Sequence, residues 1–236
     1  MNKNIDFFKN HSYVGRGIVI GMTPDQKNYV QVYWIMGRSE NSRNRIFLQE
    51  ETNVRTKAFD ESKLTDPSLI IYYPVKQVAD MHIVTNGDQT DTIESHLFNG
   101  ETFESALETR TYEPDQPNYT PRISGIIYFD QENTTYSLSV LKNIDPEKTN
   151  VPQRSYFNYE KAIAGQGHFI HTYEKNTDPL VSFQGEPKAM PTFNTIEETK
   201  DFYWNNLNDD NKVSLLVKFI DSETGEATID IVNKNV

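Results

Sequence analysis

The chain of 236 residues has a formal net charge of −11, 36% hydrophobic residues and no cysteine. This composition predicts a folded globular protein, and its acidity argues against a nucleic-acid binder, which needs a broad basic surface. The lack of cysteine excludes disulfides, thiolate zinc sites and a cysteine nucleophile. The chain shows neither a secretory leader nor an apolar stretch of about 18 residues, so we expect no membrane association and a cytoplasmic location.

The first expected elements are antiparallel strands. Residues 16–22 and 29–36 flank a turn at Pro24-Asp25 and predict a hairpin, and a further strand is expected over 45–49. Two short apolar runs, 69–73 and 81–84, are bounded by prolines and by Asn86-Gly87. Runs of this length favour central strands over helices.

Helices are expected next. The stretch DTIESHLF predicts a helix with Asp91 as its N-cap and Glu94 three residues later. A second helical segment follows, in which Phe103 and Leu107 share one face.

The remaining elements are another hairpin, a helix and two last strands. Residues 122–129 and 135–141 predict the hairpin, and Thr195 with Glu198 predicts a capping box for a helix ending near Leu207. Strands are expected over 213–220 and 227–232. Because the strands come mostly as hairpins, the sequence predicts an α+β fold with mostly antiparallel sheets, in a single domain of residues 1–236.

Positive charge is concentrated near the N-terminus. Five of the eight arginines lie between positions 16 and 55, and the stretch WIMGRSENSRNRIF holds Arg38, Arg43 and Arg45. Arginine forks match phosphate oxygens, and the neighbouring serine and asparagine side chains add donors. The stretch therefore indicates an anion pocket, with Arg16 nearby if the hairpin pairs. The alternative is a solvated hairpin exit whose arginines pair with surface acids.

Two later segments also have two readings. Residues 85–93 lead from a strand to a helix start, which could bind a ligand oxygen or form only a turn and an N-cap. The loop 110–123 contains Glu113 and three prolines, and could hold catalytic groups or merely end a helix. We expect no metal site at His168 and His171, because residues three apart in a strand point to opposite faces.

Several of these segments, taken in order, resemble the archaeal-type IMP cyclohydrolase family over roughly the first 125 residues. They are Tyr13-Val-Gly-Arg16, Arg38-Ser39 with Asn44-Arg45, Asn86-Gly87 with Thr90-Asp91-Thr92-Ile93, Tyr112-Glu113 with Asn118, and Thr120-Pro121-Arg122-Ile123. The most specific part is TDTI followed by YE…N…TPRI. The chain departs from the family in a bulkier turn between Arg38 and Arg45 and in Tyr119, inserted after Asn118.

The resemblance implies a four-layer αββα sandwich of the Ntn-hydrolase-like type, with residues 1–12 as an N-terminal extension. It also implies closure of 5-formamidoimidazole-4-carboxamide ribotide to inosine monophosphate (IMP), with loss of water and without metal or cofactor. The chain has no threonine, serine or cysteine at a processed N-terminus, so the nucleophile usual in that fold is not expected. The alternatives are a non-catalytic purine-nucleotide-binding module or an enzyme acting on another phosphorylated imidazole or purine. The expected partner is a small-molecule ribotide, and a homo-oligomer is allowed for.

Within this resemblance, Arg45 is expected to stabilise charge on the formyl oxygen and Glu113 to transfer protons. Tyr72 or Tyr73 is expected as the neighbouring donor, since only one of two adjacent tyrosines can face a given side of a strand. The sequence does not separate the two, and Tyr73 is chosen. The expected substrate-binding residues are Arg16, Arg38, Arg43, Asn44, Asn86, Thr90, Asp91, Asn118, Thr120 and Arg122.

Overall fold

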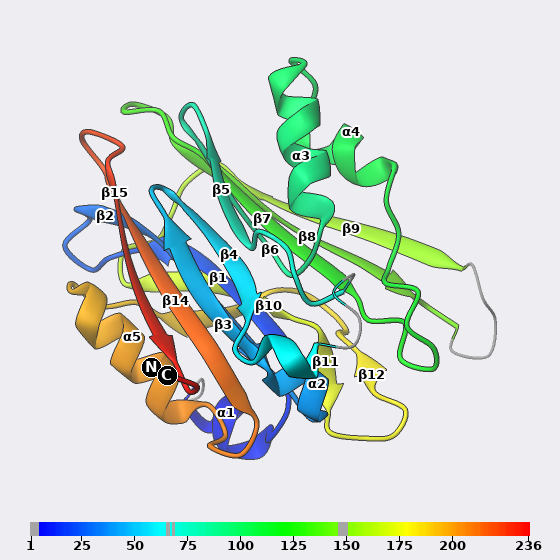
Figure 1. The fold of residues 1–236 in the computed structure, drawn as a ribbon. Coiled ribbons are helices and arrows are strands. Elements are labelled where there is room, and N and C mark those ends of the chain that lie inside the picture. Colours follow the sequence, from blue (N-terminus) through cyan, green and yellow to red (C-terminus); the bar gives the residue numbers. More distant parts are fainter. Residues whose placement is uncertain (1–4, 65–66, 68, 146–150) are drawn as a thin grey trace.

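Two antiparallel β-sheets dominate the computed structural model, which describes residues 5–64, 67, 69–145 and 151–236 (Figure 1). The first sheet has the strand order β13 (Lys188–Pro191), β10 (Gln166–His171), β1 (Arg16–Met22), β2 (Asn28–Met36), β14 (Lys212–Asp221) and β15 (Ala227–Asn233). The second has the order β3 (Arg45–Glu50), β4 (Asn53–Ala58), β5 (Val75–Val78), β6 (Met81–Thr85), β7 (Arg122–Tyr128), β8 (Thr135–Asn143) and β9 (Pro152–Tyr159). A short ribbon of β11 (Tyr173–Lys175) and β12 (Val181–Ser182) stands apart from both sheets.

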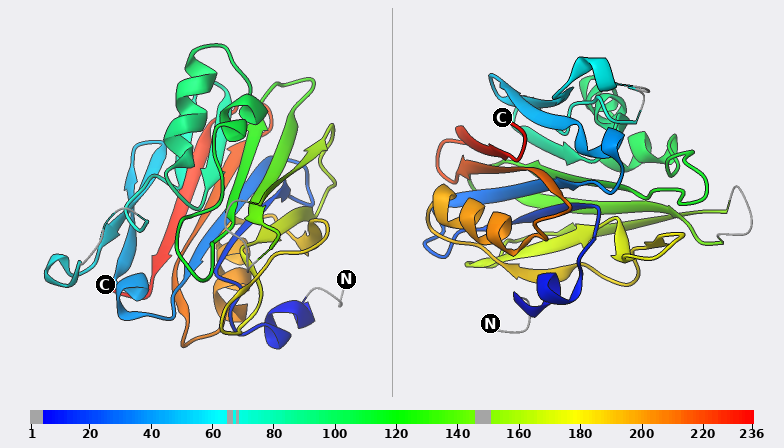
Figure 2. Two further views of the ribbon diagram at one scale, coloured as in Figure 1. Left: turned by 90° about the vertical axis from the view of Figure 1, so that its right-hand side faces the viewer. Right: turned by 60° about the horizontal axis from the view of Figure 1, so that its bottom comes forward.

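The helices cover the outer faces of the sheets (Figure 2). Helices α3 (Gln89–Phe98) and α4 (Phe103–Glu108) lie on the seven-stranded sheet, and α1 (Ile5–Asn10) and α5 (Ile196–Asn206) lie on the six-stranded sheet. The shorter turns α2 (Glu40–Arg43) and η1 (Glu61–Lys63) flank β3 and β4 in the chain. No helix in the described ranges combines the length and apolarity needed to cross a membrane.

Three hydrophobic clusters result from this arrangement. The largest lies between the sheets and takes Ile18 and Tyr33 from one sheet and Val84 from the other. A second packs Trp34 against the side of α1 and α5, and a third packs Ile126 beneath α3 and α4. Because both faces of β1 are covered, all of its residues are buried and its sequence is apolar almost throughout.

Most of the expected elements are confirmed, including the hairpins β1–β2 and β7–β8 and the last strands β14 and β15. Of the capping box expected for α5, the structure shows the half in which the Thr195 side chain accepts from the N–H of Glu198. The strand expected over 69–73 is wrong. That segment forms turns in which the carbonyl of Pro67 accepts from the N–H groups of Ile70 and Ile71, and the strand follows at β5 instead. The N–H group and the hydroxyl of Thr56 both donate to the carbonyl of Tyr72. This carbonyl therefore has hydrogen-bond partners although the segment is not a strand of the sheet.

The start expected for the first long helix is also wrong. Asp91 is not its N-cap, because α3 begins at Gln89 and Asp88 occupies the N-cap position. Asp88 makes no side-chain cap bond, since its carboxylate binds two arginines instead.

Candidate active site

Two buried arginines are each the first residue of a strand. Arg16 begins β1 and Arg45 begins β3, directly after the α2 turn that Ser39 and Ser42 cap reciprocally. Residues 45 and 47 share a face of β3, and Phe47 belongs to the core between the sheets. Arg45 is 0% exposed, and its Nε donates to the carbonyl of Ser42 at 2.9 Å. Neither of its terminal nitrogens has a hydrogen-bond partner within the described part of the chain.

The charges of these arginines depend on their neighbours. Burial and the charge of Arg16 lower the pKa of Arg45. Burial alone would also lower the pKa of Arg16, but Glu113 and several tyrosines hold it well above the ordinary arginine value. The two guanidinium groups are therefore close enough to influence each other, and Glu113 is the acidic group that favours the charge on Arg16.

A pair of tyrosines lies beside the arginines. The hydroxyl groups of Tyr33 and Tyr72 are 2.7 Å apart and buried, and burial raises the pKa of Tyr33 well above its usual range. Tyr72 acts electrostatically on both Arg16 and Arg45.

Tyr73, the tyrosine chosen from the sequence, lies elsewhere. Its hydroxyl donates to Glu50 at 2.9 Å, and Glu50 also pairs with Arg55 at 2.7 Å. Because residues 69–73 form turns rather than a strand, alternation along a strand could not identify the inward-facing tyrosine. The structure places Tyr72, not Tyr73, beside the buried arginines.

Glu113 supplies a buried carboxyl group from the loop after α4. Its backbone N–H donates to the carbonyl of Thr120 at 2.9 Å, which holds the loop against the start of β7. The side chain is nearly inaccessible, and burial raises its pKa from 4.5 to about 7 in spite of the opposing charges of Arg16 and Arg122. At neutral pH this carboxyl can therefore both accept and donate a proton.

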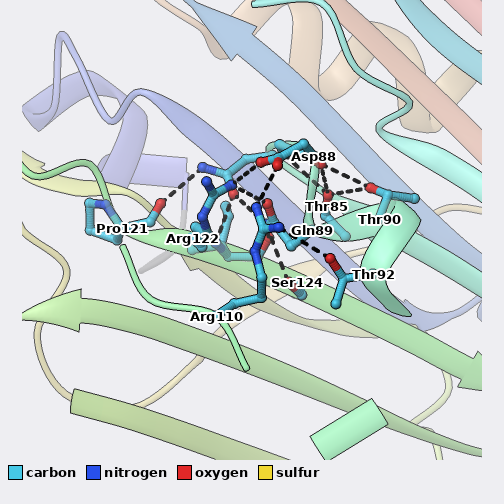
Figure 3. Close-up of polar contacts among 12 residues, drawn as sticks. Thr85, Asp88, Gln89, Thr90, Thr92, Arg110, Pro121, Arg122 and Ser124 are labelled. Carbon is cyan, nitrogen blue, oxygen red and sulfur yellow. Dashed lines mark hydrogen bonds and ion pairs between the residues drawn. The ribbon is translucent and has the colours of Figure 1, made fainter. Parts of the chain in front are cut away.

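Arg122 is held by a network at the start of α3 (Figure 3). Its Nη1 donates to Asp88 Oδ1 and to Gln89 Oε1, each at 2.7 Å. The other oxygen of Asp88 accepts from Arg110 at 2.5 Å. A Cβ atom at Gly87 would lie 2.8 Å from Arg122 Nη1 and 3.5 Å from a carboxylate oxygen of Glu113. Glycine therefore leaves the space in which these two charged groups approach the backbone.

Several of the expected binding residues support the polypeptide around this network. The side chain of Asn86 donates to the carbonyl of Pro121 and accepts from the N–H of Ile123 at 2.8 Å. Thr90 bonds to the hydroxyl of Thr85 at 2.6 Å. The Asn86 bonds join the end of β6 to the start of β7, and the Thr85–Thr90 bond joins the end of β6 to α3.

Thr120 and Asn118 connect the loop that carries Glu113 to the segment of the β11–β12 ribbon. The Thr120 hydroxyl bonds to Asp115 and to the hydroxyl of Tyr173. Asn118 accepts from the N–H of Leu180 at 3.0 Å. The loop is therefore held both by a bond within itself and by bonds to the segment that contains the ribbon.

The other expected binding residues lie further out. Arg38 donates to Asn176 and to the carbonyl of Thr177 and lies over the ring of Tyr13 at 5.3 Å.

Arg43 donates to the carbonyl of Gly37 and to Asn211, and Asn44 bonds to the backbone of Asp60. Asp91 is 60% exposed and pairs at 2.8 Å with Lys76 of β5.

Sequence reasoning missed four residues of the site: Tyr33, Asp88, Gln89 and Arg110. Tyr33 could have been found, because Arg16 pairs with Ile35 and residues 33 and 35 share a face of β2. The network of Asp88 offered no comparable signal, since it joins segments more than twenty residues apart. The described residues contain no group of three histidine, aspartate or glutamate side chains arranged to hold a metal.

These features define an α+β protein whose buried arginines and carboxyl group suit a small anionic ligand. A sequence model described as IMP cyclohydrolase-like protein matches residues 13–225. The chain belongs to this family, as its motifs predict.

Three relatives, each named IMP cyclohydrolase, show the extent of the similarity. The protein from Methanosphaera stadtmanae is 26% identical over 197 residues, which cover 82% of this chain and 85% of that protein. The Methanopyrus kandleri protein is 30% identical over 165 residues, or 68% of this chain and 75% of that protein. The Methanococcus maripaludis protein is 34% identical over 128 residues, which are 52% of this chain and 62% of that protein, less than two thirds of its length.

Proposed function

We propose that this chain is an IMP cyclohydrolase that closes 5-formamidoimidazole-4-carboxamide ribotide to IMP with loss of water, in the cytoplasm. The observation that carries the proposal is Arg45, a buried guanidinium group with two nitrogens free for a ligand among the described residues, near Arg16 and Tyr72. The family membership and the names of the relatives point to the same reaction. We further propose that the two sheets and their outer helices correspond to a four-layer αββα fold of the Ntn-hydrolase-like type.

The reaction suits a site without a cofactor. The carboxamide nitrogen attacks the formyl carbon of the same molecule, and a C–N bond forms. The formyl oxygen then leaves as water with one proton from the carboxamide nitrogen and one from the formamido nitrogen. Since both reacting groups are already joined, holding them in an attack-ready conformer supplies much of the acceleration.

Arg45 is proposed to stabilise the charge that develops on the formyl oxygen during attack. Its Nε is already occupied by Ser42, which orients the two terminal nitrogens as a preformed pair of donors. Donors of this kind contribute about 3–4 kcal/mol when they are positioned before the reaction.

Glu113 is proposed to accept the proton of the carboxamide nitrogen and to return a proton to the departing hydroxyl. A pKa of about 7 suits both roles at neutral pH, because the two protonation states are then similarly populated. Tyr72, in place of Tyr73, is proposed as the neighbouring hydroxyl donor, with Tyr33 holding it in position.

The ribotide is proposed to bind around these groups. Arg16 and Arg122 provide positive charge, and Thr120 a hydroxyl, at the inner part of the site. We assign Asn86 and Thr90 a role in supporting the backbone. At the rim of the binding site we place Arg38, Arg43, Asn44 and Asn118. Asp91 is not retained, since it pairs with Lys76 and is exposed.

The proposal is tested by incubating the purified protein with the formamido ribotide and measuring IMP. IMP formation in the absence of added metal or nucleotide is the expected result, and no product at saturating substrate would overturn the proposed activity. Thermal unfolding with the ribotide and with IMP distinguishes the enzyme from a non-catalytic nucleotide-binding module. Stabilisation by both compounds without turnover would indicate the module.

A further inference from the structure

A second polar cluster lies inside the core between the sheets, away from the arginines. Lys218 of β14 lies directly opposite Gln31 of β2 in the strand register. The side-chain amide of Gln31 donates to the backbone carbonyl of His82 on β6 at 2.9 Å. All three residues are 0% exposed. Gln31 precedes Tyr33 by two residues on the same inner face of β2, so the cluster is displaced along the strand from the tyrosine pair.

Four polar atoms of this cluster have no hydrogen-bond partner in the part of the chain that the structure describes. They are Lys218 Nζ, Gln31 Oε1 and both ring nitrogens of His82. Buried polar groups are nearly always paired with protein, water or an ion. These unpartnered atoms belong to three strands of both sheets that the Gln31 bond and the β2–β14 pairing bring together, and they leave hydrogen-bonding capacity for an occupant.

The charge of the cluster indicates what that occupant is. Burial lowers the pKa of Lys218 to about 7, and no described carboxylate contributes to its electrostatics. Burial, and then the charge of Lys218, lower the pKa of His82 to about 3, so the imidazole is neutral and offers one N–H donor. Below pH 7 the site thus combines a cation with a neutral donor, and no described carboxylate supplies a counter-charge.

We propose that Gln31, His82 and Lys218 form an internal binding site for one small monovalent anion of about the size of chloride. The Lys218 ammonium and the imidazole N–H donate to the anion, and Gln31 Oε1 accepts from a remaining ammonium proton. Water could satisfy the same hydrogen bonds but would leave the ammonium charge uncompensated.

Thermal unfolding in chloride and in gluconate at equal ionic strength tests this site. At pH 6, where Lys218 is protonated, chloride should raise the melting temperature of the wild-type protein in a saturable way, and gluconate should not. The Lys218→Met variant should lose the chloride response. Lys200→Met removes a more accessible lysine, paired with Asp230 on the outer side, and should keep the response.

Chloride could instead bind beside Arg16 and Arg45, and a second variant distinguishes that site from the one at Lys218. Arg45→Met should keep the chloride response if the anion binds at Lys218. A melting temperature independent of chloride would overturn the proposal, as would a response that persists in Lys218→Met. Crystals grown with bromide should show an anomalous peak between Lys218 and His82, and a peak for water alone would also overturn it. None of these readouts depends on the cyclohydrolase activity.

Discussion

Replacing Arg45 with methionine should raise the free energy of unfolding and lower turnover at the same time. Its two terminal nitrogens are buried without a partner among the described residues, and the charge of Arg16 opposes its own. Each unsatisfied buried group costs about 1–3 kcal/mol. Methionine has a similar length and gives up only the hydrogen bond to Ser42, worth about 1 kcal/mol.

The net gain is about 1–5 kcal/mol in the free energy of unfolding without substrate. For a chain of this size, each kcal/mol shifts the melting temperature by about 2–4 °C. Loss of the preorganised donors should lower kcat by about 10²–10³-fold. Thermal unfolding and the rate of IMP formation measure the two effects separately.

Arg55→Met is the matched control from the neighbouring strand β4. Arg55 pairs with Glu50 at 2.7 Å and is partly exposed, so the change should cost at most about 1 kcal/mol and leave kcat unchanged. The reasoning on Arg45 is refuted if Arg45→Met is destabilised by several kcal/mol like an ordinary core truncation, or if it keeps the wild-type kcat.

Three further predictions concern the carboxyl group, the tyrosines and the arginine network. Burial raises the pKa of Glu113 from 4.5 to about 7, so the native state holds a proton that the unfolded state has lost, and its stability falls as the pH rises through this window. Glu113→Gln should remove that loss, which amounts to up to about 3 kcal/mol at pH 8. The same change should lower kcat by about 10²–10⁴-fold. Unfolding and rate profiles between pH 4 and 9 measure both effects, and wild-type profiles would contradict them. Tyr72→Phe should lower kcat by about 10²-fold and Tyr73→Phe should not, because only the Tyr72 hydroxyl lies beside the buried arginines; the opposite order would reverse the assignment. Asp88→Asn should weaken the hold on Arg122 and lower kcat/KM by about 10²-fold, and an unchanged ratio would show that Arg122 needs no anchor.

The sequence by itself determined the elements that depend on local chemistry. Alternating polarity and turn residues predicted the hairpins β1–β2 and β7–β8, and Thr195 marked the start of α5 because its hydroxyl caps the N–H of Glu198. The family motifs also identified Arg45 and Glu113 as candidates. Each of these signals lies within a few residues of the structure that it predicts.

Only the tertiary structure decided which side chains meet. Tyr72 points inward because turns tied to Thr56 replace the expected strand, and the anchor of Arg122 comes from Asp88, 34 positions earlier in the chain. The burial that raises the pKa of Glu113 likewise comes from segments folded over its loop. Such properties depend on contacts between distant segments and on the exclusion of water, and neither leaves a periodic trace in the sequence.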